Sequence, residues 1–255
     1  MIDFKYDEYA YAEHIIESGF TSQLSNELRI VATYYRRIFD YKQTEVKAKL
    51  TDLCREHINS FHVGNYYKVI NKAISVAFKD NARLVKIREI PIFQKELDYI
   101  NQPDLSTNEK RVLFTLLVMH KIKKERYRQI YQKESQSNVY FAKNGRFTEI
   151  KKFSNIPQSL DIDLDVFYSL TLKGYINPLY NGNIQLLFLD KCISSEAPVA
   201  MISDFRNLGY RFEILTGNNK YIVCQHCGIP CLKRNNSAIY CSESCCLQAK
   251  QGQSC

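Results

Sequence analysis

The chain of 255 residues is 45% hydrophobic and rich in Tyr and Phe, a composition typical of folded rather than disordered protein. No apolar run approaches the ~20 residues of a membrane-spanning helix, and the acidic, aromatic N-terminus does not resemble a secretory signal, so we expect a cytoplasmic protein. The net charge is +8, and the segment from Glu109 to Lys152 carries all of it, with twelve Lys and Arg against four Glu.

The first hundred residues have apolar side chains at helical spacing, which predicts a helical domain over residues 1–103. Three helices are expected, with the apolar sets Leu28, Val31, Tyr35, Ile38 and Phe39, then Val46, Leu50, Leu53, Cys54 and Ile58, then Tyr66, Ile70, Ile74 and Ala77. Pro91 is expected to begin a further short helix, Ile92–Ile100, because proline is tolerated in a first helical turn.

The middle of the chain, residues 104–195, has the element order of a winged helix. Ser106 and Glu109 form a capping-box pattern before an apolar helix. The stretch Lys121–Lys133 is polar and basic, and residues 132–144 are rich in Ser, Gln and Asn, so a loop is expected nearby. A short helix follows near Ile150, and a third helix lies between Leu160 and Tyr175. The apolar set of this third helix is Leu164, Phe167, Tyr168 and Leu172, and Gly174 ends it.

The turn Asn181-Gly182-Asn183 then predicts a β-hairpin, because Asn-Gly favours tight hairpin turns. Three helices followed by a hairpin indicate a winged-helix-like domain, with a generic α+β domain as the alternative. The fold class we predict is α+β and mainly α.

Residues 196–255 are expected to contain a connector and a small zinc-binding module. Seven of the nine cysteines lie between Cys224 and Cys255, and two pairs have metal-ligand spacing: Cys224 with Cys227, and Cys241 with Cys245. Four thiolates leave no open coordination position, so the Zn²⁺ would be structural. The ligand choice stays open, because Cys246 adjoins Cys245, and His226 and Cys231 are within reach.

We find no catalytic constellation and predict that the chain is not an enzyme. Phosphate-binding glycine loops and the nucleophile motif G-x-S-x-G are absent from the sequence. Asp161, Asp163 and Asp165 alternate with apolar residues and are interpreted as a helix N-terminus or an exposed strand face rather than a magnesium site.

The basic segment is the candidate nucleic-acid surface, because Lys and Arg neutralise phosphates and the neighbouring Tyr127 and Tyr131 can stack on bases. Its candidate residues are Lys121, Lys123, Lys124, Arg126, Arg128, Lys133, Lys143, Arg146, Lys151 and Lys152. The third predicted helix carries the three aspartates, however, and carboxylates repel phosphates. A protein partner is therefore the alternative.

With the segments LFTLLV, KGYI, FRNLGY and CQHCG…YCSESC placed, the chain resembles uncharacterised phage and prophage proteins of low-GC Gram-positive bacteria. These have a helical N-terminal region, a winged-helix-like middle and a C-terminal zinc ribbon or treble clef. The resemblance implies Cys224, Cys227, Cys241 and Cys245 as metal ligands, although Cys231, Cys246 and Cys255 are additions to the plainer pattern.

The resemblance also implies a phage protein in the cytoplasm of a bacterial host cell. We expect a nucleic-acid-binding protein with a regulatory or replication-related role. The alternative is a factor that binds and inhibits a host component, such as a polymerase or a defence complex. Neither a membrane nor a small-molecule substrate is expected as a partner.

Overall fold

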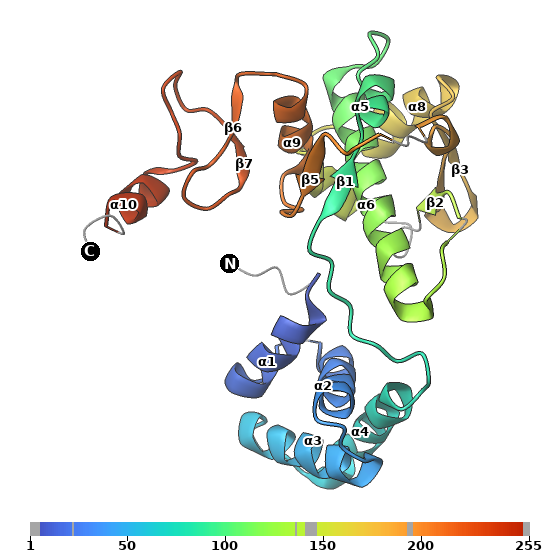
Figure 1. The fold of residues 1–255 in the computed structure, drawn as a ribbon, viewed down its shortest axis with the longest axis vertical. Helices are drawn as coiled ribbons and strands as arrows, with labels where there is room; N and C mark the ends of the chain where they lie inside the picture. The colour runs from blue at the N-terminus through green and yellow to red at the C-terminus, as the bar shows by residue number, and fades with distance from the viewer. Residues whose placement is uncertain (1–5, 22, 136, 141–146, 193–195, 252–255) are drawn as a thin grey trace. The chain divides into compact units, whose positions relative to one another are not determined.

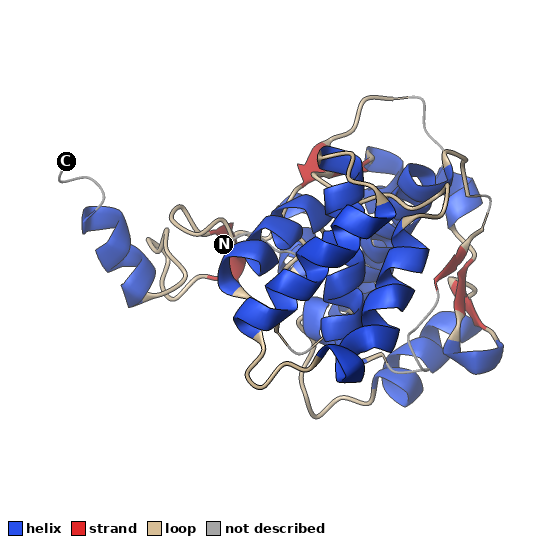
Figure 2. Ribbon diagram, turned by 90° about the horizontal axis from the view of Figure 1, so that it is seen from below, coloured by secondary structure: helices blue, strands red, loops and turns tan. Residues whose placement is uncertain are grey.

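The computed structural model describes residues 6–21, 23–135, 137–140, 147–192 and 196–251, and within them the chain is mainly helical (Figure 1). The strands are short and form three small antiparallel sheets in these residues (Figure 2). The α+β, mainly α prediction is therefore confirmed. Two compact units divide the chain: residues 1–88 with 124–135, and residues 89–123 with 136–255.

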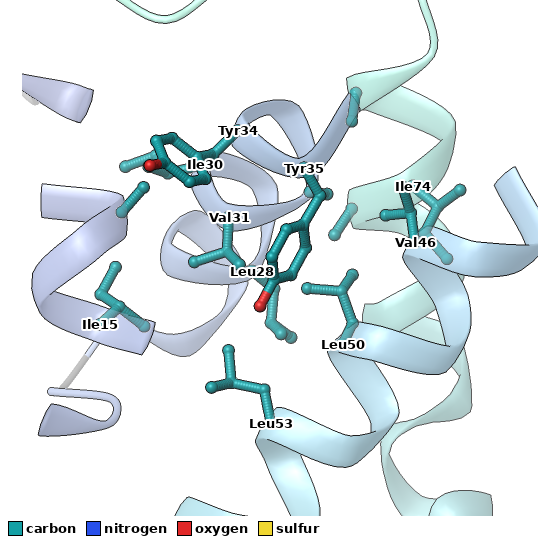
Figure 3. Close-up of a cluster of buried hydrophobic side chains, with 14 of the residues drawn as sticks. Ile15, Leu28, Ile30, Val31, Tyr34, Tyr35, Val46, Leu50, Leu53 and Ile74 are labelled. Carbon is teal, nitrogen blue, oxygen red and sulfur yellow. The ribbon is translucent and has the colours of Figure 1, made fainter. Parts of the chain in front are cut away.

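In its described residues the first unit contains α1 (Glu8–Ser18), α2 (Leu24–Ile38), α3 (Gln43–His57) and α4 (Val63–Ala77), together with the end of a longer helix. The three helices predicted from apolar spacing correspond to α2, α3 and α4. The facing sides of α1 to α4 form a core that includes Ile15, Leu28, Val31, Leu50 and Ile74 (Figure 3). Ile38 and Phe39, which the pattern assigned to the buried face, are half exposed because α2 ends at Ile38.

A buried carboxylate attaches the end of the long helix α6 (Thr107–Tyr131) to the first unit. Oε1 of Glu8 accepts hydrogen bonds from Arg29 at 3.0 Å and Arg126 at 2.7 Å, and its Oε2 accepts the N–H of Val85 at 3.0 Å. A carboxylate removed from water needs such partners, because desolvation penalises an unpaired charge. The last turns of α6, from Lys124 onward, therefore belong to this unit.

The second unit begins with β1 (Ile90–Ile92), α5 (Gln94–Ile100) and the larger part of α6. Next come β2 (Val139–Tyr140), α7 (Thr148–Phe153) and a π-helical turn (Ile162–Phe167) that continues into α8 (Tyr168–Leu172). They are followed by β3 (Ile176–Pro178), a 3-10 turn (Tyr180–Gly182), β4 (Ile184–Leu186), a second 3-10 turn (Leu189–Cys192), β5 (Ala200–Ile202) and α9 (Leu208–Leu215). Strand β4 lies between β2 and β3. Strand β1 pairs with β5 (Figure 1).

Local sequence signals determine several boundaries of this unit. The N–H of Ser106 donates to Oε2 of Glu109 at 2.6 Å, so the predicted capping box does begin α6. Gly174 has a φ of +75° and follows the end of α8, as predicted from its preference for left-handed backbone. The predicted hairpin is present as the antiparallel pair β3–β4.

Pro91 does not begin a helix, which corrects the sequence prediction. It lies in the middle of β1, opposite Met201 of β5, and α5 begins only at Gln94. Both strands of a two-stranded sheet are edge strands, where the missing N–H of proline is tolerated. The helix is started instead by Glu96, whose Oε2 accepts the N–H of Phe93 at 2.9 Å.

The compact units divide the chain differently from the predicted ranges 1–103, 104–195 and 196–255. The first unit ends at Arg88, because α5 packs within the second unit with Leu97 and Ile100 buried. Pairing of β5 with β1 places the start of the predicted connector beside Ile90–Ile92. Helix α6 continues through the basic stretch and ends at Tyr131, directly before the Ser-, Gln- and Asn-rich residues where a loop was expected.

Gly209 in α9 generates a stability prediction. A Cβ on this residue would lie 1.9 Å from the carbonyl oxygen of Ser154, which is part of the backbone and has no flexible end to move. We expect Gly209→Ala to lower the free energy of unfolding by about 2 kcal/mol or more, as overpacking does. The measurement is urea unfolding followed by circular dichroism.

The matched control is Gly64→Ala, a helical glycine with no atom near the added Cβ. It should be neutral or stabilising by up to about 1 kcal/mol, because alanine favours helix. Equal stabilities of the two variants would contradict the close approach of α9 to Ser154.

Candidate metal centre and interaction surfaces

The C-terminal module consists of a hairpin and a helix. Strands β6 (Tyr221–Val223) and β7 (Pro230–Leu232) pair antiparallel, and α10 spans Glu243–Gln251. The turn between the strands contains Cys224 and Cys227, while Cys241 precedes α10 and Cys245 lies in its first turn. The sequence therefore brings one cysteine pair from a turn toward a second pair at a helix start.

The turn after β6 has the tight shape that two ligands on one side of a metal require. The N–H of Gly228 donates to the carbonyl of Cys224 at 2.9 Å, and the N–H of Cys224 donates to the carbonyl of Ile229 at 3.0 Å. Gly228 has a φ of +72°, a conformation that L side chains rarely adopt. Gly228 therefore permits the tight turn between the two cysteines and β7.

Cys224, Cys227, Cys241 and Cys245 form the predicted cluster, with their sulfur atoms all within 4.8 Å of one another. Sγ of Cys241 lies 3.6 Å from Sγ of Cys227 and 3.4 Å from Sγ of Cys245. A tetrahedron with metal–sulfur bonds of about 2.3 Å has edges of about 3.8 Å. The four side chains therefore fit one metal ion and could hold it.

The surroundings of the cluster favour unequal ionisation of its thiols. Burial raises the pKa of Cys224, but the backbone N–H groups of Cys227, Cys241 and His226 outweigh that effect and lower it to about 6. Burial, together with the neighbouring Cys245, raises the pKa of Cys241 to about 12. Thiolates this close repel one another, so a bound cation is what allows all four to ionise together.

The alternative ligands are not members of the cluster that the described residues form. Nε2 of His226 contacts Oε1 of Gln248 at 3.1 Å on the exposed side of α10. Cys231 and Cys246 are partly buried and are not among the four clustered sulfurs. Cys255 lies outside the described residues.

Arg111 of α6 connects the cysteine-bearing hairpin to the helical part of the second unit. Its Nε donates to Oε1 of Glu213 in α9 at 2.8 Å, and its terminal nitrogen donates to the hydroxyl of Tyr221 in β6 at 2.6 Å. The guanidinium also lies 5.3 Å from the ring centre of Tyr210 and 5.2 Å from that of Tyr221. Cation–π contacts and the ion pair together fix where the hairpin begins.

The candidate nucleic-acid residues are not equivalent in the structure. Lys121 donates to Glu96 at 2.7 Å, and Arg126 is bound to the buried Glu8. Arg128 pairs with Glu125 at 2.7 Å on the surface of α6. Lys151 donates to the carbonyl of Gln158 at 2.7 Å, which holds a loop after α7. Lys121, Arg126 and Lys151 thus have structural partners that the sequence did not reveal.

The other candidates differ in exposure, and two of them lie outside the described residues. Burial lowers the pKa of Lys123 to about 8, and Lys124 is partly buried. Lys133 and Lys152 are exposed. Lys143 and Arg146 lie outside the described residues.

Two tyrosines accompany the basic side chains at the end of α6. Tyr127 is 38% exposed and Tyr131 is 48% exposed, and their ring centres lie 4.6 Å apart. The spacing of four residues places both on one face of the helix. The expected association of aromatic and basic side chains is therefore present here.

The three aspartates form the helix start that was expected as their structural role. Oδ1 of Asp161 accepts the N–H groups of Asp163 at 2.9 Å and Leu164 at 3.1 Å, and Asp165 accepts the N–H of Asp161 at 2.8 Å. Burial and the neighbouring Asp161 raise the pKa of Asp163. Two of the three carboxylates are thus explained by capping.

The buried face of the third helix differs from the prediction. Leu164, Tyr168 and Leu172 are exposed, whereas Val166 and Leu170, which the pattern did not select, are buried beside Phe167. A π-helical turn has more residues per turn than an α-helix, so it rotates the buried face relative to the expected spacing. Val166, Phe167 and Leu170 were the alternative apolar set that could have indicated this.

Comparison of the chain with protein-family models, with curated proteins and with solved structures gave no match in any of the three. None of the helices in the described parts of the chain combines the length and the apolar character needed to cross a bilayer.

The cysteine cluster predicts a metal stoichiometry of one ion per chain. Cys224→Ser and Cys241→Ser should each lose the metal and unfold residues 221–251, because three thiolates and a hydroxyl bind a divalent ion far more weakly. Metal content measured by mass spectrometry after gel filtration tests this. Cys246→Ser is the control and should keep the metal, so metal loss in that variant alone would show that the ligand set is wrong.

Proposed function

We propose that the protein binds nucleic acid, with a regulatory or replication-related role, and that its metal is a structural Zn²⁺. The observation that carries the binding proposal is the exposed pair Tyr127 and Tyr131 within the basic end of α6. The resemblance to phage proteins fits this role, and we propose that the chain acts in the cytoplasm of a bacterial host.

The order of elements supports a winged-helix-like assignment for the middle of the chain. Helix α6, strand β2, helices α7 and α8, and the hairpin β3–β4 follow one another as helix, strand, two helices and wing. The sheet order β2-β4-β3 places the first strand beside the hairpin, as this topology requires. Many domains of this kind bind nucleic acid, although the fold alone does not determine function.

The choice of Zn²⁺ rests on the donor set. Four cysteine sulfurs that lie within 4.8 Å of one another favour Zn²⁺ among the common divalent ions, and four protein ligands would close its coordination shell. A closed shell has no position for a substrate or an activated water. The ion would therefore stabilise the module rather than take part in catalysis.

The end of α6 offers both components of a single-strand binding surface. Tyr127 and Tyr131 expose aromatic faces on which bases can stack, and stacking tolerates any base sequence. Lys124, Arg128 and Lys133 lie within a few residues of the pair and supply positive charge for phosphates. Arg128 remains about half exposed despite its pairing with Glu125, so its guanidinium can still reach an anion.

The double variant Tyr127→Ala/Tyr131→Ala tests this surface. Its affinity for a labelled single-stranded oligonucleotide at low salt should fall at least about tenfold, because base stacking contributes about 1–3 kcal/mol per base. Fluorescence anisotropy measures the change. Tyr180→Ala removes an exposed tyrosine from the wing and serves as the control, with unchanged affinity expected.

Salt provides an independent measurement on the unaltered chain. The logarithm of the binding constant should fall linearly with the logarithm of salt concentration, because phosphate contacts release counterions. Absence of binding at low salt, or full affinity in the double tyrosine variant, would contradict the proposal.

A further inference from the structure

The third helix of the middle region exposes a continuous apolar stripe. Leu164 is 72% exposed, Tyr168 63% and Leu172 71%, and the three residues follow one another at intervals of four. Residues four apart lie on the same side of a helix, so the stripe runs along the whole element from the π-helical turn to the end of α8. Single exposed leucines are common, but an aligned set of large apolar side chains indicates an interaction site.

The stripe is not the core face of a loosely attached helix. Val166, Phe167 and Leu170 on the other side are buried, and they already supply the packing that holds the element in place. Glu109 of α6 adds polar anchors, since it accepts a hydrogen bond from Ser169 at 2.6 Å and pairs with Lys173 at 2.8 Å. The helix therefore has two apolar faces, and only one of them is used within the described residues.

The charges along this helix are all of one sign. Asp161, Asp163 and Asp165 are exposed at the start of the stripe, and the sequence has no Lys or Arg between Lys152 and Lys173. Lys173 itself is committed to Glu109 and to the carbonyl of Asp104. The carbonyl end of a helix carries partial negative charge as well, so both ends of the stripe favour positive groups.

These charges discriminate between possible occupants. Phosphates would face carboxylates along the helix, which argues against nucleic acid at this face. A second copy of the chain would bring the same acidic stripe against itself, with no free basic residue on the element to offset the repulsion. A protein partner with apolar side chains flanked by Lys and Arg complements both the apolar stripe and the aspartates beside it.

We propose that Leu164, Tyr168 and Leu172 form a docking surface for a basic amphipathic helix of another protein. The apolar side chains of that helix would pack on the stripe, while its Lys and Arg would lie over Asp161, Asp163 and Asp165. This surface is separate from the aromatic and basic residues of α6, so it adds a protein-binding activity to the proposed nucleic-acid binding. The third helix of the winged-helix-like region then recruits a protein instead of reading DNA.

The test selects ligands for the full-length, metal-loaded chain from a displayed library of random peptides about 16 residues long, enough for four helical turns. We expect the selected sequences to share apolar residues at intervals of three and four, with Lys or Arg between them. A synthetic peptide of the consensus sequence is then titrated by fluorescence anisotropy.

Variants connect the binding to the stripe. Leu164→Ser/Leu172→Ser should weaken peptide binding at least tenfold, and Asp163→Lys should weaken it several-fold and reduce its salt dependence. Leu247→Ser changes a similarly exposed helical leucine of α10 and should bind the peptide as the unaltered chain does. All these positions are exposed, so equal thermal unfolding curves confirm that folding is unaffected.

Several results would overturn the docking proposal. One is a library selection that shows no enrichment of basic and apolar residues. A second is undiminished peptide binding by the double leucine variant. A third is a dimer, detected by sedimentation velocity, that dissociates in this variant. Loss of oligonucleotide binding in the double leucine variant would also overturn it, because the stripe would then belong to the nucleic-acid surface. If the unaltered chain does not bind oligonucleotides, the proposed function is wrong, but the peptide measurement still tests the docking surface.

Discussion

The arrangement of the C-terminal module depends on four sulfur atoms meeting at one point. Helix α10 has no buried residue, and apart from Cys224 the hairpin and helix bury almost nothing of their own. A segment with so little apolar core does not fold from hydrophobic burial alone, and a metal ion bound by the four cysteines would supply the missing constraint. The positions of the four cysteines therefore determine the geometry of the module. Most of its surface is exposed, because the module has almost no core of its own.

Arg111 links the C-terminal module to the rest of the second unit. It stands on the longest helix, pairs with Glu213 of α9 and donates to the hydroxyl of Tyr221, where the cysteine-bearing hairpin begins. One side chain thus joins a long helix, a short helix and a hairpin that are far apart in sequence. Because the guanidinium is almost fully buried, loss of Glu213 would leave an uncompensated charge, which is costly.

Prediction from sequence succeeded where structure is determined locally. The cysteine spacing, the Ser106–Glu109 capping box and the Asn-Gly hairpin each act over a few residues, and the structure contains all three. It failed where the structure depends on contacts between residues that are far apart in the sequence. Arg126 pairs with Glu8 across 118 residues, Pro91 pairs with a strand near residue 200, and the π-helical turn moves the third helix off the expected spacing. The exposed stripe on that helix was invisible for the same reason, since apolar spacing does not show which side faces the core.

We propose that a metal ion is a structural element of the C-terminal module, and that nucleic acid and a protein partner bind elsewhere on the chain. Hydrogen–deuterium exchange of the full-length protein, compared before and after metal removal by a chelator, tests it most directly. The account predicts loss of protection in residues 221–251 and in α9, with little change in α1 to α4. Unchanged exchange in the cysteine-bearing peptides, or an equal loss of protection throughout the chain, would contradict it.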